Sequence, residues 1–275
     1  MDLDRGALRV VETLRAAGHR ALLAGGCVRD LLMGRTAKDW DIATDADPDQ
    51  VASLFARTLP VGAHFGICVV VLEEGHYEVA RFRRDGPYAN GRHPTSVEAA
   101  DARADALRRD FTINGLFLDP ANREIIDYVG GRADIERGLL RAIGDPVERF
   151  AEDYLRLLRC VRFAARLGFA IEESTYAALC AHAPRIDAVS PERIEDELTR
   201  MLTERGVVRG LELLMDSGLL QVVLPEVADL RGVQQPPEFH PEGDVWNHVL
   251  LVMDQLREPP RSEEHTSELQ SPCNL

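Results

Sequence analysis

Residues 22–44, LLAGGCVRDLLMGRTAKDWDIAT, combine short apolar segments with a double glycine and a pair of aspartates. The apolar segment 21–24 is predicted to be a strand that the double glycine ends. Residues 28–33 favour a helix, and 40–44 favour a second strand. This order of strand, glycine turn, helix and strand predicts the start of an α+β domain.

The two aspartates of this stretch, Asp39 and Asp41, flank Trp40. Residues two apart on a strand point to the same side, with Cα atoms roughly 6.5 Å apart. Two carboxylates that close repel each other unless a cation lies between them, and Mg²⁺ prefers oxygen ligands. The pair therefore indicates a magnesium site. The alternative is a surface strand whose two charges are simply solvated, which is the commoner case for an isolated pair.

The double glycine, Gly25 and Gly26, allows the backbone to come close to a ligand, and the helix that follows directs free N–H groups at an anion. Arg29 adds a positive charge on that helix. The alternative is a tight strand-to-helix turn in which glycine serves packing. A phosphate cradle beside a metal-binding carboxylate pair predicts a nucleoside triphosphate site.

The remaining patterns divide the chain into an α+β head and an all-helical part. In the head we expect a helix at 3–18 and strands at 67–72 and 77–82. Gly and Pro residues predict a mobile loop at 83–107, whose arginines could contact phosphate or RNA: Arg83, Arg84 and Arg92. Strand patterns end near residue 146, and helices are predicted at 148–168, 172–182, 191–204 and 206–217.

Composition limits the class of protein. The 275 residues include 32 basic and 46 acidic side chains, a net charge of −14, so RNA binding would need a local basic surface on an acidic body. No apolar run approaches the roughly 20 residues of a membrane helix, so no membrane partner is expected. The five cysteines are scattered without a CxxC pair, which argues against a disulfide framework or a structural zinc site. We expect a soluble, cytoplasmic protein.

Four ordered motifs carry a family resemblance: residues 22–44, RRDFTIN at 108–114, EDYLRLLRCVRFAARLGF at 152–169 and PERIEDEL at 191–198. The first resembles the nucleotidyltransferase head shared with DNA polymerase beta. Together they are similar to the class II tRNA nucleotidyltransferases (CCA-adding enzymes) and the bacterial poly(A) polymerases, over about residues 20–256. Gly115 and Cys160 stand where that family usually has alanine.

The resemblance implies a polymerase beta-like fold, a mixed sheet with helices, followed by an all-helical region. The expected parts are a nucleotidyltransferase head at 1–145, a helical neck for base recognition and RNA binding at 146–205, a helical body with the start of a truncated HD-like domain at 206–260, and a disordered or non-native tail at 261–275.

Asp153 and Arg156 are three residues apart on a predicted helix, so they share a face. An ionised Asp only accepts hydrogen bonds and Arg only donates them. Cytosine and adenine each offer an amine to the Asp and an acceptor to the Arg, whereas guanine and uracil place a carbonyl where the amine should be. Unpaired polar groups would reject those two bases, and this fits the role that the family gives to the matching positions.

Further site residues are carried over from the resemblance alone. Arg159 and Arg162 match positions that help to bind the nucleotide, and Arg109 and Asn114 match positions near the triphosphate and ribose. The alternatives are a solvated helix face with ion pairs, such as Glu152 with Arg156, and simple loop anchoring by RRDFTIN. Glu78, on a strand expected to neighbour the carboxylate pair, could be a third acidic ligand or an exposed, ion-paired glutamate.

The resemblance implies addition of C and A residues from CTP and ATP to the tRNA 3′ end. An RNA 3′-hydroxyl would attack the α-phosphate in line and release pyrophosphate, with two Mg²⁺ ions held by Asp39 and Asp41. The alternatives are a poly(A) polymerase, an enzyme that adds only CC or only A, and an inactive RNA-binding homologue.

An HD phosphohydrolase is a further alternative, because HPEGDVWNH at 240–248 resembles the opening of an HD domain. That domain needs a later His-Asp pair, and the sequence contains no such dipeptide. We therefore expect His240 and His248 to be surface or helix-capping residues.

Overall fold

A computed structural model describes residues 2–60, 66–89 and 93–255. The chain forms two compact units. The first comprises Met1–Arg156 and Phe169–His182, and the second comprises Leu157–Gly168 and Ala183–Leu275. The four-part division expected from the sequence stays a prediction, and its last part, 261–275, lies outside the described residues.

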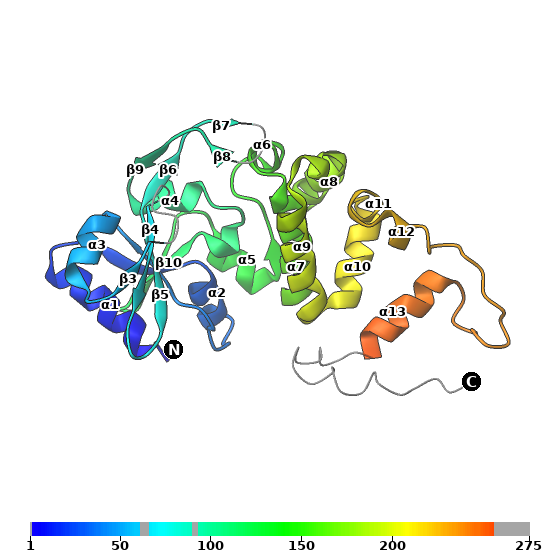
Figure 1. The fold of residues 1–275 in the computed structure, drawn as a ribbon, viewed down its shortest axis with the longest axis horizontal. Coiled ribbons are helices and arrows are strands. Elements are labelled where there is room, and N and C mark those ends of the chain that lie inside the picture. Colours follow the sequence, from blue (N-terminus) through cyan, green and yellow to red (C-terminus); the bar gives the residue numbers. More distant parts are fainter. Residues whose placement is uncertain (1, 61–65, 90–92, 256–275) are drawn as a thin grey trace, which may run out of the picture. The chain divides into compact units, whose positions relative to one another are not determined.

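A mixed sheet of seven strands forms the centre of the first unit (Figure 1). In spatial order the strands are β11 (Glu124–Asp127), β10 (Leu116–Asp119), β1 (Ala21–Ala24), β2 (Asp41–Thr44), β5 (His76–Arg81), β4 (Ile67–Val71) and β3 (Thr58–Leu59). Neighbouring strands are antiparallel except β2 and β5, which run parallel. The predicted strands at 21–24, 67–72 and 77–82 are confirmed.

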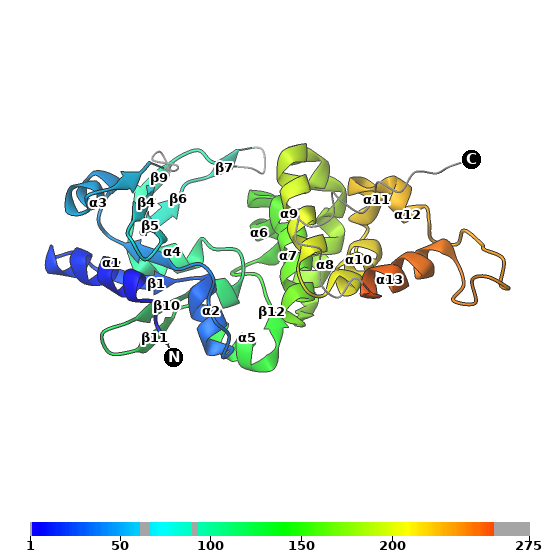
Figure 2. The same cartoon turned by 60° about the horizontal axis from the view of Figure 1, so that its bottom comes forward.

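Helices cover both faces of this sheet because alternate strand residues point to opposite sides. Leu23 and Ile42 pack with the helices α1 (Arg5–Ala16), α2 (Gly26–Leu32) and α3 (Pro48–Leu54). Leu22, Ala43 and Phe117 point the other way, toward α4 (Ala102–Leu107). Beside one end of the sheet, α2 lies next to α5 (Gly131–Arg137) (Figure 2).

The strand expected at 40–44 begins only at Asp41, so the prediction that Asp39 and Asp41 share a strand face is wrong. Asp39 lies in an exposed bend before β2. The reason is the pairing with β1, whose last paired residue, Ala24, lies opposite Asp41. Beyond Ala24 the chain turns at Gly25, with φ +70°, so residues before Asp41 have no strand partner.

The segment 83–107, predicted to be a mobile loop, contains regular structure. β6 (Arg83–Asp85) pairs with β9 (Val97–Ala99), and β7 (Tyr88–Ala89) pairs with β8 (His93–Pro94). The helix α4 follows Asp101, which accepts a hydrogen bond from the Ala104 N–H as its N-cap. The glycines and prolines concealed these short elements, because strand pairing depends on residues distant in sequence. Arg92 lies outside the described residues.

The helix predicted at 148–168 is two helices, α6 (Pro146–Glu152) and α7 (Leu155–Leu167), which Asp153 separates in an extended conformation. The expectation that strands end near residue 146 is also wrong, because β13 (Ala170–Ile171) pairs in parallel with β12 (Leu139–Leu140). Directly after β13, α8 (Glu173–His182) packs on α6.

The second unit is helical. Apart from the part of α7 that it contains, its elements are η3 (Ala183–Ala188), α9 (Pro191–Thr203), α10 (Val207–Asp216), α11 (Leu220–Val223), α12 (Pro225–Ala228) and α13 (Val245–Gln255). α10 packs against both α9 and α13. Met201 of α9 lies against Gly210 of α10, where a Cβ atom would approach its sulfur to 2.8 Å. Across the described ranges, every helix is too short or too polar to span a bilayer.

We expect Gly131→Ala to lower the free energy of unfolding by about 1–3 kcal/mol, because a Cβ atom there would lie 2.1 Å from the Thr112 carbonyl oxygen. Urea denaturation measures the effect. Arg132→Ala, at the neighbouring exposed position, is the control and should cost less than about 0.5 kcal/mol. Equal stabilities of the two variants would contradict the close approach.

Candidate active site

Asp41 lies at the edge where β2 begins, on the sheet face that α4 covers. Its partner in the parallel register is Glu78 of β5, so the two carboxylates lie on adjacent strands. Glu78, which the sequence left open between a site residue and an exposed glutamate, is exposed and beside Asp41. Two acidic side chains on neighbouring strands favour occupation of this edge by a cation.

Burial and neighbouring charges shift the pKa of Asp41. Desolvation is the largest cause and Glu78 the next, and together they raise the pKa to about 6. The charge of Asp39 also raises it, so the exposed Asp39 still acts on Asp41 across the bend. Arg109 and Arg29 act in the opposite direction, and Arg109 has the larger effect. Asp41 is therefore a carboxylate that additional positive charge would stabilise.

The glycine turn lies directly against this carboxylate. A Cβ atom at Gly25 would lie 2.9 Å from Nη1 of Arg109 and 3.9 Å from Oδ2 of Asp41. The left-handed φ of Gly25 and this crowding both exclude a larger residue. The turn predicted to hold phosphate and the carboxylate predicted to hold metal are thus brought together by the fold.

Arg29 and Asn114, predicted as site residues from separate motifs, contact each other. The Arg29 guanidinium, 3% exposed, donates from Nη1 to Oδ1 of Asn114 at 2.7 Å. Its Nε and Nη2 groups are directed to Oδ1 of Asp30, at 2.9 and 2.8 Å. Nδ2 of Asn114 donates to Oδ1 of Asp110 at 3.0 Å. This series of hydrogen bonds attaches RRDFTIN to α2. The structure thus shows the loop anchoring that was the alternative to nucleotide binding for Asn114.

Asp105, which the sequence analysis missed, positions Arg109. It is 1% exposed and accepts from Nη2 and Nε of Arg109 at 2.9 and 3.2 Å. The Arg109 guanidinium lies 5.2 Å from the centre of the Phe117 ring, and Nη1 donates to the Asn114 carbonyl. The i,i+4 spacing after the N-cap Asp101 was a signal that could have revealed this pair.

Asp153 and Arg156 do not share a helical face, because Asp153 lies in the break before α7. Its carboxylate accepts from the Leu155 N–H at 3.1 Å, which begins the new helix. The buried Arg156 guanidinium forms an ion pair with Glu152 and donates to the Arg149 carbonyl at 2.8 Å. The pair with Glu152 is the alternative considered above, although it is partly buried rather than fully solvated. A role in base recognition stays a prediction.

Arg159 and Arg162 lie in the second unit, where both contact Glu197 of α9. Nε of Arg162 is 2.6 Å from Oε2 of Glu197, and Nη1 of Arg159 is 3.5 Å from Oε1. Glu197 is only 4% exposed, so it needs this positive charge. These contacts hold α7 to α9. Nucleotide binding by the two arginines stays a prediction.

The donor set at the sheet edge suits Mg²⁺. It consists of carboxylate oxygens alone, and Mg²⁺ commonly binds through one or two carboxylates together with substrate phosphates. In the described part of the chain, the one trio of converging His, Cys, Asp or Glu donors lies elsewhere, in the second unit. Asp39 and Asp41 therefore suit a metal ion that is bound jointly by the protein and by the nucleotide phosphates. They do not form a complete set of protein ligands.

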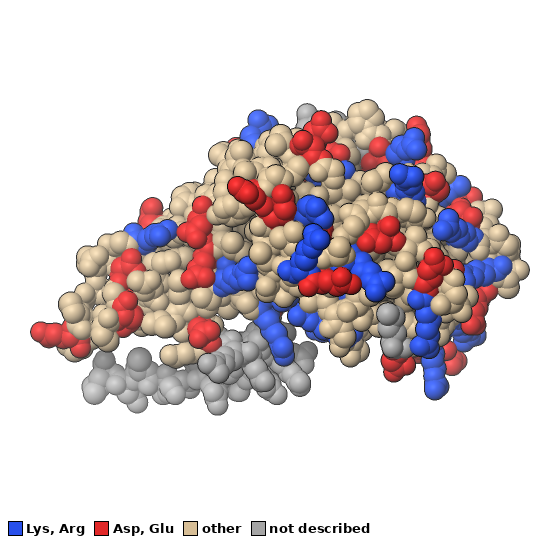
Figure 3. All heavy atoms as spheres, turned by 180° about the vertical axis from the view of Figure 1, so that it is seen from behind, with Lys and Arg blue, Asp and Glu red and all other residues tan. Residues whose placement is uncertain are grey.

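The surface charge is mixed. On the face shown in Figure 3, basic and acidic side chains alternate among the described residues despite the net charge of −14. Many arginines are paired with carboxylates, as Arg141 is with the fully buried Asp134. The local basic surface expected for RNA binding is not evident on this face.

The fold and this edge define a nucleotidyltransferase head of the polymerase beta-like class. Residues 21–141 match the family described as "Poly A polymerase head domain". Residues 168–230 match the family described as "Probable RNA and SrmB- binding site of polymerase A". The chain belongs to the family of tRNA nucleotidyltransferases and poly(A) polymerases.

Curated relatives and solved structures agree with this assignment. The chain is 44% identical over 223 residues to a CCA-adding enzyme of Geobacillus kaustophilus (81% of this chain, 55% of the relative), and 41% identical over 216 residues to one of Bacillus subtilis (78% and 54%). It thus spans about half the length of these two relatives. The crystal structure of the Bacillus stearothermophilus CCA-adding enzyme in complex with CTP superposes with a TM-score of 0.74 at 32% identity, covering 94% of this chain and 72% of that one.

We expect Asp41→Asn to stabilise the metal-free protein at pH 8 by about 1–3 kcal/mol. Because the folded pKa is raised to about 6, ionisation of Asp41 weakens the fold as the pH rises from about 4 through 6. The gain should disappear below about pH 4. Urea denaturation across this pH range measures it.

The control is Glu136→Gln, whose carboxylate is exposed in an ion pair with Arg132. It should show no comparable gain. If Asp41→Asn is less stable than the wild type at pH 8 without metal, the crowding of carboxylates at this edge is disproved.

Proposed function

We propose that this chain is the catalytic part of a template-independent RNA nucleotidyltransferase that adds C and A residues, from CTP and ATP, to the tRNA 3′ end in the cytoplasm. One observation carries the proposal: Asp41, beside Glu78, lies against the glycine turn and Arg109. Curated relatives called CCA-adding enzymes, and a relative solved with CTP, support it. The buried thiols of Cys27 and Cys68 suit a reducing compartment.

In the proposed reaction, Asp39 and Asp41 would hold two Mg²⁺ ions. The metal would supply positive charge to activate the RNA 3′-hydroxyl and to stabilise the leaving pyrophosphate. Gly25 and Gly26 let the triphosphate approach the backbone. Arg109, fixed by Asp105, directs positive charge to the same edge. Arg29 already donates hydrogen bonds to Asp30 and Asn114. It therefore contributes positive electrostatic potential near the triphosphate and anchors the glycine turn, rather than binding the phosphates directly.

Asp153 and Arg156 are proposed to read the base edge. Both lie in the first unit, at the junction of α6 and α7. The Arg156 guanidinium is held by Glu152 and two backbone carbonyls, so its orientation is set before a nucleotide arrives. A preorganised donor of this kind discriminates well, because it cannot adapt to a base that offers the wrong group.

Asp39→Asn and Asp41→Asn should each keep the fold and lower nucleotide incorporation by at least about 10³-fold, because a metal-binding carboxylate is lost. The assay offers tRNA lacking its 3′ end, with each labelled nucleotide alone and then CTP with ATP. Stepwise growth by C, C and A by the wild type supports the proposal, and a long A tail supports a poly(A) polymerase. Full activity of the Asp41 variant would refute the metal assignment.

Apparent Mg²⁺ affinity should fall as the pH decreases from 7 to 5, because protons compete with the metal for Asp41, whose pKa is raised to about 6. Incorporation measured at several Mg²⁺ concentrations would show an acid limb near pH 6 that moves to lower pH as Mg²⁺ increases. If the acid limb of the pH profile stays at the same pH at every Mg²⁺ concentration, a group other than Asp41 causes the loss of activity.

Asp153→Asn should weaken discrimination of CTP against UTP by at least about tenfold, because the amide nitrogen adds a donor where only acceptors stood. The amide oxygen can still accept from the Leu155 N–H, so the helix start is kept. Misincorporation on shortened tRNA measures the effect. Asp145→Asn, at the N-cap of α6, is the matched control and should leave selectivity unchanged.

A further inference from the structure

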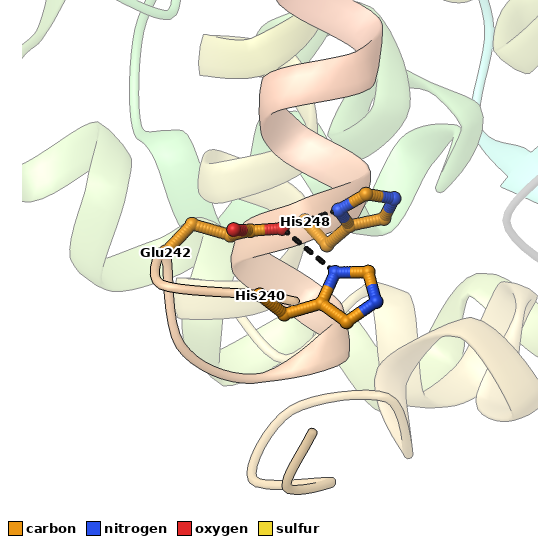
Figure 4. Close-up of side chains that lie close together, drawn as sticks. All are labelled: His240, Glu242 and His248. Carbon is orange, nitrogen blue, oxygen red and sulfur yellow. Dashed lines mark hydrogen bonds and ion pairs between the residues drawn. The ribbon is translucent and has the colours of Figure 1, made fainter. Parts of the chain in front are cut away.

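Three metal-ligating side chains converge in the second unit: His240, Glu242 and His248 (Figure 4). Nδ1 of His240 lies 3.1 Å from Oε1 of Glu242, and Nδ1 of His248 lies 2.5 Å from the same oxygen. The two imidazole rings are nearly perpendicular, with centres 4.9 Å apart. One ligand atom from each residue lies within 4.8 Å of the other two.

Local backbone structure brings these donors together. The Gly243 N–H donates to the His240 carbonyl at 3.3 Å, which closes a turn around Glu242. Gly243 has a φ of +114°, which favours glycine and directs the chain into α13. Asp244 then accepts from the Asn247 N–H at 2.9 Å and places His248 in the first turns of the helix. A turn and a helix start therefore build the trio within nine residues.

The chemistry of the trio suits a transition metal. Oε1 of Glu242 lies within hydrogen-bond distance of Nδ1 of both imidazoles, so one carboxylate oxygen already faces both nitrogen ligands. Without metal, each histidine must place a proton on Nδ1 to contact Oε1. Two imidazole nitrogens and one carboxylate oxygen form a common zinc ligand set, with ligand distances of about 2.0–2.2 Å and one position left for water.

We propose that His240, Glu242 and His248 bind one divalent transition-metal ion of the Zn²⁺ type, which replaces the protons between the imidazoles and the carboxylate. The set differs from what the HD resemblance implies, because it uses His240 and Glu242 and no His-Asp pair. It also replaces the expectation that both histidines are only surface or capping residues. The bound ion joins the turn to α13 and stabilises the end of the second unit.

The experiment uses the 275-residue chain. EDTA first removes bound metal and is then itself removed. Excess Mg²⁺ is added so that sites with only oxygen ligands are occupied before Zn²⁺ is titrated. Isothermal titration with Zn²⁺ should show one ion per chain, and thermal unfolding should show a higher Tm with Zn²⁺. Co²⁺ should give the visible absorption of a site with nitrogen and oxygen ligands. Glu242→Gln and His248→Ala should each weaken Zn²⁺ binding by at least about tenfold.

His76→Ala removes an exposed histidine of the first unit and is the matched control, expected to bind Zn²⁺ like the wild type. Circular dichroism checks that each metal-free variant is folded, and His240→Asn serves in place of any variant that is not. Equal Zn²⁺ affinity of wild type and Glu242→Gln would overturn the proposal. So would a folded wild type that binds no Zn²⁺, which would leave a hydrogen-bonded cluster only.

Discussion

The structure of the head depends on an electrostatic constraint at one point, the carboxylate of Asp41. The parallel register of β2 and β5 places Glu78 beside it, and Asp39 adds charge from the preceding bend. Burial weakens hydration of the charge, so the pKa rises to about 6. A fold that concentrates more negative charge than Arg109 and Arg29 offset is less stable than it could be, and this is common at a site that binds a cation.

Buried ion pairs around this edge limit the cost and fix its geometry. Asp105 neutralises part of the Arg108 and Arg109 charge at the end of α4 and directs Arg109 toward the glycine turn. Arg29, Asn114 and Asp110 connect α2 to RRDFTIN through buried hydrogen bonds. Pairs of this kind add little net stability but hold side chains in one orientation. Orientation is what an incoming triphosphate requires.

Errors in predicting the local structure had a common cause. The residues around Asp39 continue a strand pattern, and those around Asp153 continue a helical pattern. In the structure, however, β1 ends opposite Asp41 and the helix breaks at Asp153. Periodicity reports which residues could continue an element. It does not report where a partner strand stops, which depends on a turn elsewhere in the chain. Asp105 was missed for a similar reason, because its burial follows from the packing of α4 on one face of the sheet.

The sequence by itself determined the family, the head with its mixed α+β pattern, the glycine turn and the residues at which acidic and basic groups occur. Local signals are sufficient for these, since apolar periodicity, N-caps and glycines act within a few residues. Only the tertiary structure decided that Glu78 lies beside Asp41, that Arg109 is fixed by Asp105, and that His240, Glu242 and His248 face one another. Strand register brings Glu78 to Asp41 from a distant segment, burial of α4 fixes the Asp105 ion pair, and the path of a turn sets the third contact. Apolar periodicity reports none of these three features.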